Sequence, residues 1–395
     1  MAARDALAEW VEELPLVDHH VHGPFRASVS RVRFENALNE GSTDPLPVFV
    51  SGFDSQLGFA VRRWCAPVLD LEPHAAPDAY WARRAELGEP EVNRRFLTAA
   101  GVSDWVVDTG FGADDVLSIE EVRSLTGAAA HEVVRLEAIA AGLLAEGADD
   151  YAERFRSAVA DAVERGAVGA KSVLAYRTGF DIDWSRPSGA EVEGAADAWV
   201  ADQGDAPLKD PRLIVFGILT AVDAGLPVQF HVGFGDRDLD LHRVNPMLLL
   251  PLLRTPEVQR VPVLLLHCYP FEREAGYLAQ AFGNVYLDVG LALNYVGAQA
   301  PGLVARSYET APFAKVLYSS DAWGPAELHY LGARLWRNAV ARVLGAWVDD
   351  GEWSLPDACR VLELAAQTNP RRLYRLDSAV PPIPAPPTHH RKDRP

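Results

Sequence analysis

Residues 16–24 read LVDHHVHGP, which places an aspartate and three histidines directly after an apolar start. Side chains on a β-strand alternate between two faces. The spacing therefore predicts that Asp18, His20 and His22 share one face, with His19 on the opposite, outward face. Two imidazoles at i and i+2 near the end of one strand can bind a single divalent cation. We interpret this pair as the start of a metal site, in preference to an ordinary hydrogen-bonded core histidine.

Seven further runs resemble this one, because each is rich in β-forming residues and ends near a polar or small residue. They are VSDWVVDTGF (102–111), HEVVRLEAI (131–139), AVGAKSVLAY (167–176), LPVQFHVG (226–233), VPVLLLHCY (261–269), NVYLDVGLAL (284–293) and KVLYSSDAWG (315–324). Segments with helical spacing, such as 150–165, 211–224 and 326–347, lie between them. Nearly continuous apolar strands are typical of parallel sheets buried on both faces. The pattern predicts an α/β fold, a closed (β/α)8 TIM barrel with helical insertions at the C-terminal face of the strands.

The chain is longer than a bare barrel requires. Such a barrel needs about 250 residues, whereas this chain has 395. Most of the surplus lies at about 23–101, with helical patches at 58–69, 77–87 and 91–100, and at about 177–211. Both segments follow a predicted strand. We predict a single barrel over residues 1–378, with both insertions forming a lid over the pocket. Residues 379–395 are rich in proline and polar residues, which is typical of a disordered tail.

Composition restricts the classes of function. A formal charge of -18 leaves no broad basic surface, so we expect no nucleic-acid partner. Three widely spaced cysteines favour a reducing, cytoplasmic location. The acidic N-terminus does not resemble a signal peptide, and no run reaches membrane-spanning length, so we expect no membrane partner. The expected partner is a small-molecule substrate, and a homodimer is left open.

Three other predicted strands end in a residue that commonly binds metals. His231 ends the fifth run, His267 ends the sixth, and Asp321 ends the eighth. An unpaired imidazole or carboxylate after a buried strand is costly unless a partner such as a metal compensates it. The C-terminal ends of barrel strands meet at one rim. We therefore predict that these three side chains converge with His20 and His22, in preference to five independently satisfied polar residues.

The pattern D-x-H-x-H on the first strand, lone histidines on the fifth and sixth, and an aspartate on the eighth resembles the amidohydrolase superfamily of metal-dependent barrel hydrolases. Within it, the chain is similar to the amidohydrolase-related branch. That branch includes the amidohydrolase-like domain joined to a glutamine-synthetase-like domain in some fungal and plant proteins, which the stretch AKSVLAYRTGF (170–180) resembles.

The resemblance implies a site and a chemistry. It implies that His20, His22 and Asp321 hold a divalent metal, with Zn²⁺ expected first and Mn²⁺ or Fe²⁺ as alternatives. It further implies that Asp321 takes the proton from water, while His231 and His267 complete the coordination or polarise the substrate. Zinc lowers the pKa of a bound water to about 7, which agrees with hydrolysis near neutral pH.

Lys171, on the fourth predicted strand, and Arg177, just after it, leave several roles open. Binuclear members of the superfamily carry a carboxylated lysine near this strand end, so Lys171 could bridge two metals. Alternatively it stays an ammonium that binds a substrate carboxylate or oxyanion, or it is a buried lysine paired with an acid. Arg177 either grips a substrate carboxylate or forms an ordinary salt bridge. Both stand as catalytic candidates beside Asp321 and His267.

The predicted function is metal-dependent hydrolysis of an amide-type C–N bond or a C–O bond in a small, carboxylate-bearing substrate, with Asp321 as general base. Two alternatives stay open. Related barrels use the same ligands for non-oxidative decarboxylation or isomerisation, and a catalytically silent metal-binding scaffold is the third reading. The loop after His231, which carries Asp236, Arg237, His242 and Asn245, is expected to close over the substrate.

Overall fold

The computed structural model describes residues 3–41, 45–112, 114–202 and 207–376, with a few isolated positions beyond. Most of the predicted tail at 379–395 lies outside the described residues. One parallel sheet contains seven strands that neighbour one another in sequence order. They are β1 (Leu16–Val21), β2 (Val102–Asp108), β3 (Ala129–Arg135), β4 (Gly169–Ser172), β5 (Val228–Val232), β6 (Val263–His267) and β7 (Val285–Leu287).

A less regular extended segment, residues 316–322, closes the sheet between β7 and β1. On one side Leu317 N donates to Leu287 O over 3.0 Å, and on the other Asp321 N donates to His20 O over 3.1 Å. This segment is the eighth run predicted from the sequence. The protein therefore has the predicted (β/α)8 TIM barrel, with an irregular eighth strand.

Helices surround the strands and build the insertions. Those in the first half of the chain are α1 (Ala3–Glu13), α2 (Arg31–Asn36), α3 (Gln56–Ala60), α4 (Pro77–Leu87), α5 (Glu89–Ala99), α6 (Ile119–Thr126), α7 (Leu136–Glu146), α8 (Tyr151–Glu164) and α9 (Gly189–Asp202). Those in the second half are α10 (Pro211–Asp223), α11 (Leu250–Leu253), α12 (Glu272–Ala281), α13 (Gly290–Val296), α14 (Ala300–Ser307), α15 (Ala326–Asp349), α16 (Leu355–Glu363) and α17 (Asn369–Tyr374). None of the described helices is long and apolar enough to span a bilayer.

Apolar side chains fill the closed end of the barrel. They form a separate buried cluster, which we call the interior cluster, to which the strands and α17 both contribute. Its members are Val17, Val106, Val133, Leu264, Leu266, Leu317, Leu373 and Tyr374. Within β2, β3 and β6 these positions alternate with residues of the outer core, such as Trp105 and Leu265. The interior is therefore packed, as in other barrels of this kind, and leaves only the opposite end for a site.

The predicted alternation along β1 is wrong at His19. Its side chain is fully buried, and Nε2 donates to Asp288 Oδ2 over 2.8 Å. The pairing of β1 with β2 shifts register between residues 18 and 21. A bulge places two residues of one strand opposite one of its neighbour and breaks strict alternation. Val17 belongs to the interior cluster, so alternation also turns His19 inward, contrary to the prediction. The register shift then brings His20 to the same side, and His20 and His22 reach the mouth.

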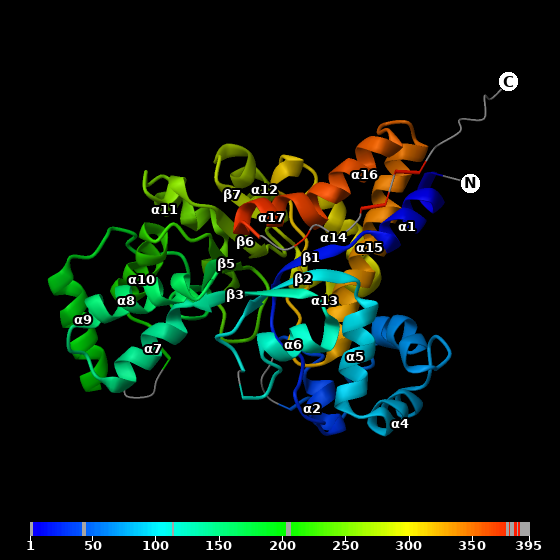
Figure 1. Cartoon of the computed structure of the whole chain (residues 1–395), viewed down its shortest axis with the longest axis horizontal. Helices are drawn as coiled ribbons and strands as arrows, with labels where there is room; N and C mark the ends of the chain where they lie inside the picture. The colour runs from blue at the N-terminus through cyan, green and yellow to red at the C-terminus, as the bar shows by residue number, and fades with distance from the viewer. Residues whose placement is uncertain are drawn as a thin grey trace.

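The first insertion is largely helical. Two of its predicted helical patches coincide with α4 and α5, and Figure 1 shows these helices together with α2 on one side of the strands. Arg84 of α4 is buried, where Nε donates to Glu327 of α15 over 2.8 Å and Nη2 to Glu89 over 2.7 Å. This buried ion triad ties the insertion to the barrel.

The second insertion also contains a helix. After an irregular start, α9 packs with α7 and α8 around α10, and Figure 1 shows this group on the side of the strands away from α4 and α5. Residues 213–222 of α10 are all buried, and Phe216 packs against Phe155 of α8 with ring centroids 5.6 Å apart. A helix that is apolar all round, as α10 is, must be covered on several sides. Covering α10 is the role that α9 plays.

Replacing Arg84 with methionine should lower the free energy of unfolding by about 3–5 kcal/mol, because two carboxylates stay buried without their cation. Urea denaturation measures the loss. The matched control is Arg94→Met, which removes a solvent-exposed pair with Glu91 and should cost less than about 1 kcal/mol. Equal losses in the two variants would contradict the proposed anchoring.

Candidate metal centre and its pocket

Three histidines surround one carboxylate at the mouth of the barrel. His20 Nε2 lies 3.0 Å and His22 Nε2 3.5 Å from Asp321 Oδ1, and these ligand atoms are all within 4.8 Å of one another. His267, at the end of β6, brings Nε2 to 3.2 Å from Asp321 Oδ2. Three predicted ligands therefore surround a fourth, Asp321, although they come from distant parts of the sequence.

The backbone is strained where it aims two of these side chains. His267 has φ 71° and Asp321 has φ 48°, a left-handed conformation that is uncommon outside glycine. Leu266 already belongs to the interior cluster, so regular alternation would turn His267 outward. The left-handed turn instead keeps His267 in the barrel, and its N donates to Asp288 Oδ1 over 2.9 Å. Strain of this kind commonly accompanies a functional site.

The protonation states suit metal binding. Burial, together with the charge of Lys171, lowers the pKa of His20 to about 3. Burial likewise lowers the pKa of His267 to about 4, so both rings are neutral at pH 7. For Asp321, burial alone would raise the pKa, but the neighbouring His267 and His20 outweigh it and hold the pKa well below the usual range. Neutral imidazole and ionised carboxylate are the forms that bind cations.

These residues fit a divalent cation. Both ring nitrogens of His267 are buried, and neither is in hydrogen-bond geometry with a partner, which is costly for a group left without compensation. Neutral imidazoles with one carboxylate form a donor set typical of zinc. Within the described ranges, His20, His22 and Asp321 are the His, Cys, Asp or Glu group close enough to hold one ion.

Hydrogen bonds behind the ligands fix the direction of each ring. His20 Nδ1 donates to Gln229 Oε1 over 2.8 Å, and Gln229 Nε2 donates in turn to the Tyr374 hydroxyl over 2.7 Å. His22 Nδ1 donates to Asp108 O over 3.1 Å. Both rings therefore present Nε2 to Asp321. Such supporting partners set the tautomer and strengthen metal binding.

His231 lies beside the group, with its ring centroid 4.6 Å from that of His267. Its Nε2 is 3.0 Å from the Tyr176 hydroxyl and 3.0 Å from Phe234 O, so it contacts neither Asp321 nor the β1 histidines in hydrogen-bond distance. Burial lowers the pKa of His231 well below its usual value. This neutral ring stands between the ligand group and the loop after β5.

Lys171 also reaches the group. It is 2% exposed, and its Nζ lies 3.4 Å from His20 Nε2. Burial lowers the pKa of Lys171 to about 8. Among the described residues no carboxylate lies within ion-pair distance of Nζ, so the pairing of this lysine with an acid is not observed. The bridging role and the substrate-binding role both remain compatible with this position.

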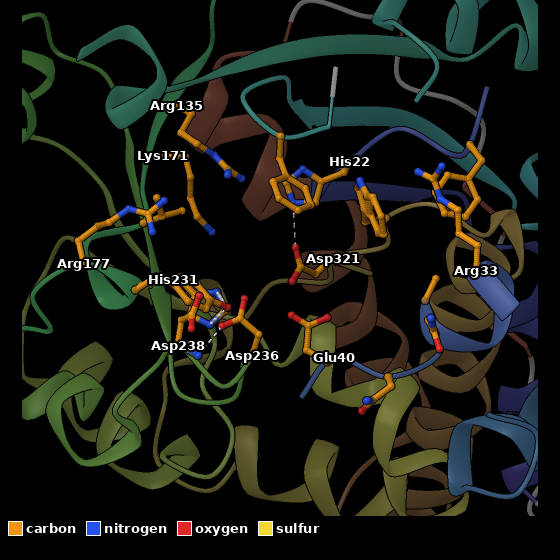
Figure 2. A pocket seen from close by; sticks show the side chains of 18 residues that line it. His22, Arg33, Glu40, Arg135, Lys171, Arg177, His231, Asp236, Asp238 and Asp321 are labelled. Atoms are coloured by element: carbon orange, nitrogen blue, oxygen red, sulfur yellow. Dashed lines mark hydrogen bonds and ion pairs between the residues drawn. The ribbon is translucent and has the colours of Figure 1, made fainter. Parts of the chain in front are cut away.

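A cavity of about 470 Å³ opens beside Asp321, and Figure 2 shows the side chains around it. Its charged lining residues are Arg33, Glu40, Arg135, Lys171, Arg177, Asp236, Asp238 and Asp321. Arg33 and Glu40 come from the first insertion, which therefore lines part of the pocket. The second insertion contributes Arg177 at its start, whereas its helix α9 packs elsewhere. A pocket of this size suits a small molecule.

One of the two roles left open for Arg177 is not observed, and the loop after β5 follows its prediction only in part. Arg177 forms no ion pair with the described residues, and its Nε is buried without a hydrogen-bond partner, so the ordinary salt bridge is not observed. In the loop after β5, Asp236 lines the cavity. His242 is exposed away from it, and Asn245 instead caps a short helix through Met247 N.

Sequence reasoning missed two residues of the site. Gln229 stands two positions before His231 on β5, and this spacing was the available signal for a second inward side chain. Glu40 lies in the pocket wall but follows no periodic pattern within the first insertion. Among the described residues, its one hydrogen bond is a long one, 3.4 Å, from the Tyr295 hydroxyl.

Comparison with known proteins identifies relatives of this chain. The sequence model of the amidohydrolase family matches residues 70–376, a range that begins after β1 and includes His231, His267 and Asp321. The curated protein fluG of Emericella nidulans is 27% identical over 424 aligned positions, covering 96% of this chain and 48% of fluG. The chain thus spans about half the length of the curated relative it matches.

Solved structures show the same fold. A protein from Lactobacillus casei ATCC 334, assigned as a metal-dependent hydrolase, superposes with a TM-score of 0.82 at 27% identity, covering 93% of this chain and 97% of its own. A uronate isomerase from Bacillus halodurans C-125 superposes with a TM-score of 0.63 at 15% identity, covering 94% and 96%. Because the isomerase is only 15% identical to this chain, its similarity shows the fold alone.

Replacing Gln229 with leucine should weaken zinc binding by about 10- to 100-fold, because His20 loses the partner that orients its ring. Competition with a chelating indicator measures the affinity. Gln299→Leu, on the surface, is the matched control and should leave it unchanged. An affinity in Gln229→Leu equal to that of the unaltered protein would contradict the supporting role.

The pH dependence of stability should reveal the raised pKa of Glu40. Burial, with the charges of Asp321 and Asp236, raises the pKa of Glu40 to about 8. A carboxyl whose pKa is raised by folding costs stability as pH rises from its ordinary pKa toward the raised one. In the metal-free protein, Glu40→Gln should therefore change the melting temperature little at pH 5 and increase it at pH 8.5.

The exposed Glu352 provides the control for this measurement, since Glu352→Gln should give the same difference in melting temperature at both pH values. A Glu40→Gln variant that is equally stabilised at pH 5 and pH 8.5 would show that this carboxyl titrates normally.

Proposed function

This chain belongs to the amidohydrolase family, and from that premise we propose that it hydrolyses an amide-type C–N bond or a C–O bond in a small, carboxylate-bearing substrate. The observation that carries the proposal is the position of Asp321, a carboxylate contacted by three imidazoles on the wall of a cavity. His20, His22 and Asp321 would hold a divalent cation, with Zn²⁺ favoured by the donor set.

A bound cation and the side chains around it would have separate roles in hydrolysis. A divalent cation bound here would polarise a substrate carbonyl and acidify water. Asp321 stays ionised at neutral pH and is placed to accept a proton from water as it attacks the carbonyl carbon. It can then return that proton to the leaving amine or alkoxide. His20 and His22, whose Nε2 atoms carry no proton, would bind the cation together with Asp321 and so hold this carboxylate in place.

Arg177 and Lys171 support a substrate that carries a carboxylate. Both line the cavity, and neither forms an ion pair with the described residues. A guanidinium binds a carboxylate through two parallel hydrogen bonds, which positions the substrate as well as attracting it. Holding the substrate by its carboxylate would place its reacting bond beside Asp321.

A decarboxylase or isomerase would use Arg177 and Lys171 in the same way, so these two side chains alone do not separate the reactions. Release of CO₂ from carboxylated compounds, compared with amine release from their amides, distinguishes them. The cavity beside the carboxylate argues against an inert scaffold, which needs no substrate space. We also propose a reducing, cytoplasmic location, since Cys65, Cys268 and Cys359 are all free and buried.

The zinc-loaded protein should release amine from a panel of carboxylate-bearing amides, and Asp321→Asn should reduce the rate by about 10²- to 10⁴-fold, as expected for loss of a general base. The matched control is Asp161→Asn, an exposed residue on α8, which should retain full activity. Metal content is measured in parallel by mass spectrometry. The proposal fails if zinc, manganese and iron all fail to bind and His20→Ala changes nothing measurable.

A further inference from the structure

Charged side chains divide the cavity into two walls of opposite sign. Figure 2 shows Arg135, Lys171 and Arg177 gathered on one side, from β3, β4 and the segment that follows β4. Glu40, Asp236 and Asp238 gather on another side, from the first insertion and the loop after β5. Asp321 and the imidazoles stand at the edge of both walls.

The cationic wall carries more charge than its protein partners neutralise. Arg135 is paired, since Nη2 lies 2.6 Å from Asp108 Oδ2. Lys171 and Arg177 form no ion pair with any described residue, although Lys171 is fully buried and Arg177 Nε is buried as well. A buried cation without a partner is costly unless a ligand supplies the opposite charge.

The acidic wall consists of Glu40, Asp236 and Asp238, and its Glu40 carboxyl has no cationic partner among the described residues. Glu40 contacts Tyr295 over 3.4 Å, and no Lys, Arg or His side chain of the described residues lies within ion-pair distance of it. Burial, with the charges of Asp321 and Asp236, raises the pKa of Glu40 to about 8, and an ammonium group placed beside this carboxyl would lower its pKa and favour the ionised form. Asp236 accepts from Asp238 N over 2.9 Å, which leaves a second carboxylate at this wall.

The two walls do not neutralise each other directly. Burial raises the pKa of Asp236, and the charge of Arg177 only partly opposes that shift, because the two side chains form no ion pair. The opposite charges therefore face the cavity with space between them. A ligand with one charge would satisfy one wall and leave the other uncompensated, which costs affinity and provides selectivity.

We propose that the substrate is zwitterionic, with its carboxylate on Arg177 and Lys171 and an ammonium-type cation on Glu40 and Asp236. The inference rests on the proposed function for the identity of the bond that reacts, which would lie beside Asp321. An amide of an amino acid, or a small compound with a carboxylate and an amine at its two ends, belongs to this class. The volume of about 470 Å³ limits the ligand to a small molecule.

The test measures binding by calorimetry to the zinc-loaded full chain, without turnover. The probes are ω-amino acids with one to six methylene groups, together with the plain carboxylate and the plain amine of each length. This range covers the unknown separation between the two walls. At least one ω-amino acid should bind 10-fold or more tightly than both its singly charged counterparts. Equal binding of the zwitterion and the carboxylate at every length would overturn the proposal.

Variants assign each charge to its wall. Arg177→Met should weaken the zwitterion and the carboxylate by 10-fold or more and leave the amine unchanged. Glu40→Gln should weaken the zwitterion and the amine and leave the carboxylate unchanged, while the surface control Glu352→Gln changes none of them. If Glu40→Gln instead removes one bound metal ion per chain and leaves amine binding intact, the acidic wall is a cation site and the proposal is wrong.

A charge reversal guards against variants that merely misfold. Glu40→Lys should bind a dicarboxylate of matching length more tightly than the unaltered protein does, a gain that damage to the fold cannot produce. Absence of this gain in a variant with an unchanged melting temperature would count against the assignment.

The two proposals can fail separately. If zwitterions bind as expected but no amide or ester is hydrolysed, the function is wrong and the binding mode stands. If singly charged amides are hydrolysed with the same KM as zwitterionic ones, the hydrolase stands and the zwitterion proposal is wrong.

Discussion

A carboxylate held among three imidazoles at the mouth of the barrel is the interaction on which the rest of the site depends. Asp321 draws together β1, β6 and the closing segment, which belong to distant parts of the chain. Burying these groups is expensive, and the protein accepts backbone strain at His267 and Asp321 to bring them together. The bulge in β1 serves the same end, because it lets two neighbouring histidines face inward. A cation at this point would compensate the buried carboxylate directly.

The fold was largely predictable because its determinants are local. Parallel strands buried on both faces are apolar along their whole length, and their helices keep a regular spacing, so eight units were visible in the sequence. The helical patch at 77–87 coincides with α4, and the segment at 211–224 with α10 to within one residue. The convergence of His20, His22, His267 and Asp321 followed from the general rule that strand ends meet at one rim.

The remaining features depend on contacts between distant residues. The inward position of both His19 and His20, which are consecutive residues, results from a register shift that β1 adopts against β2, and no local sequence pattern predicts it. Gln229 and Tyr374 meet His20 only once β5 and α17 are in place. Glu40 comes from an insertion without a regular period, so its place in the pocket wall required the packed structure. The charges that define the ligand are thus less predictable than those that define the metal.

Anomalous diffraction from crystals grown with zinc tests the central claim most directly. The account predicts a zinc peak about 2.0–2.2 Å from His20 Nε2, His22 Nε2 and an Asp321 oxygen, the usual lengths for these bonds. A zinc peak bound elsewhere on the chain, or no peak at this mouth with zinc in excess, would contradict it.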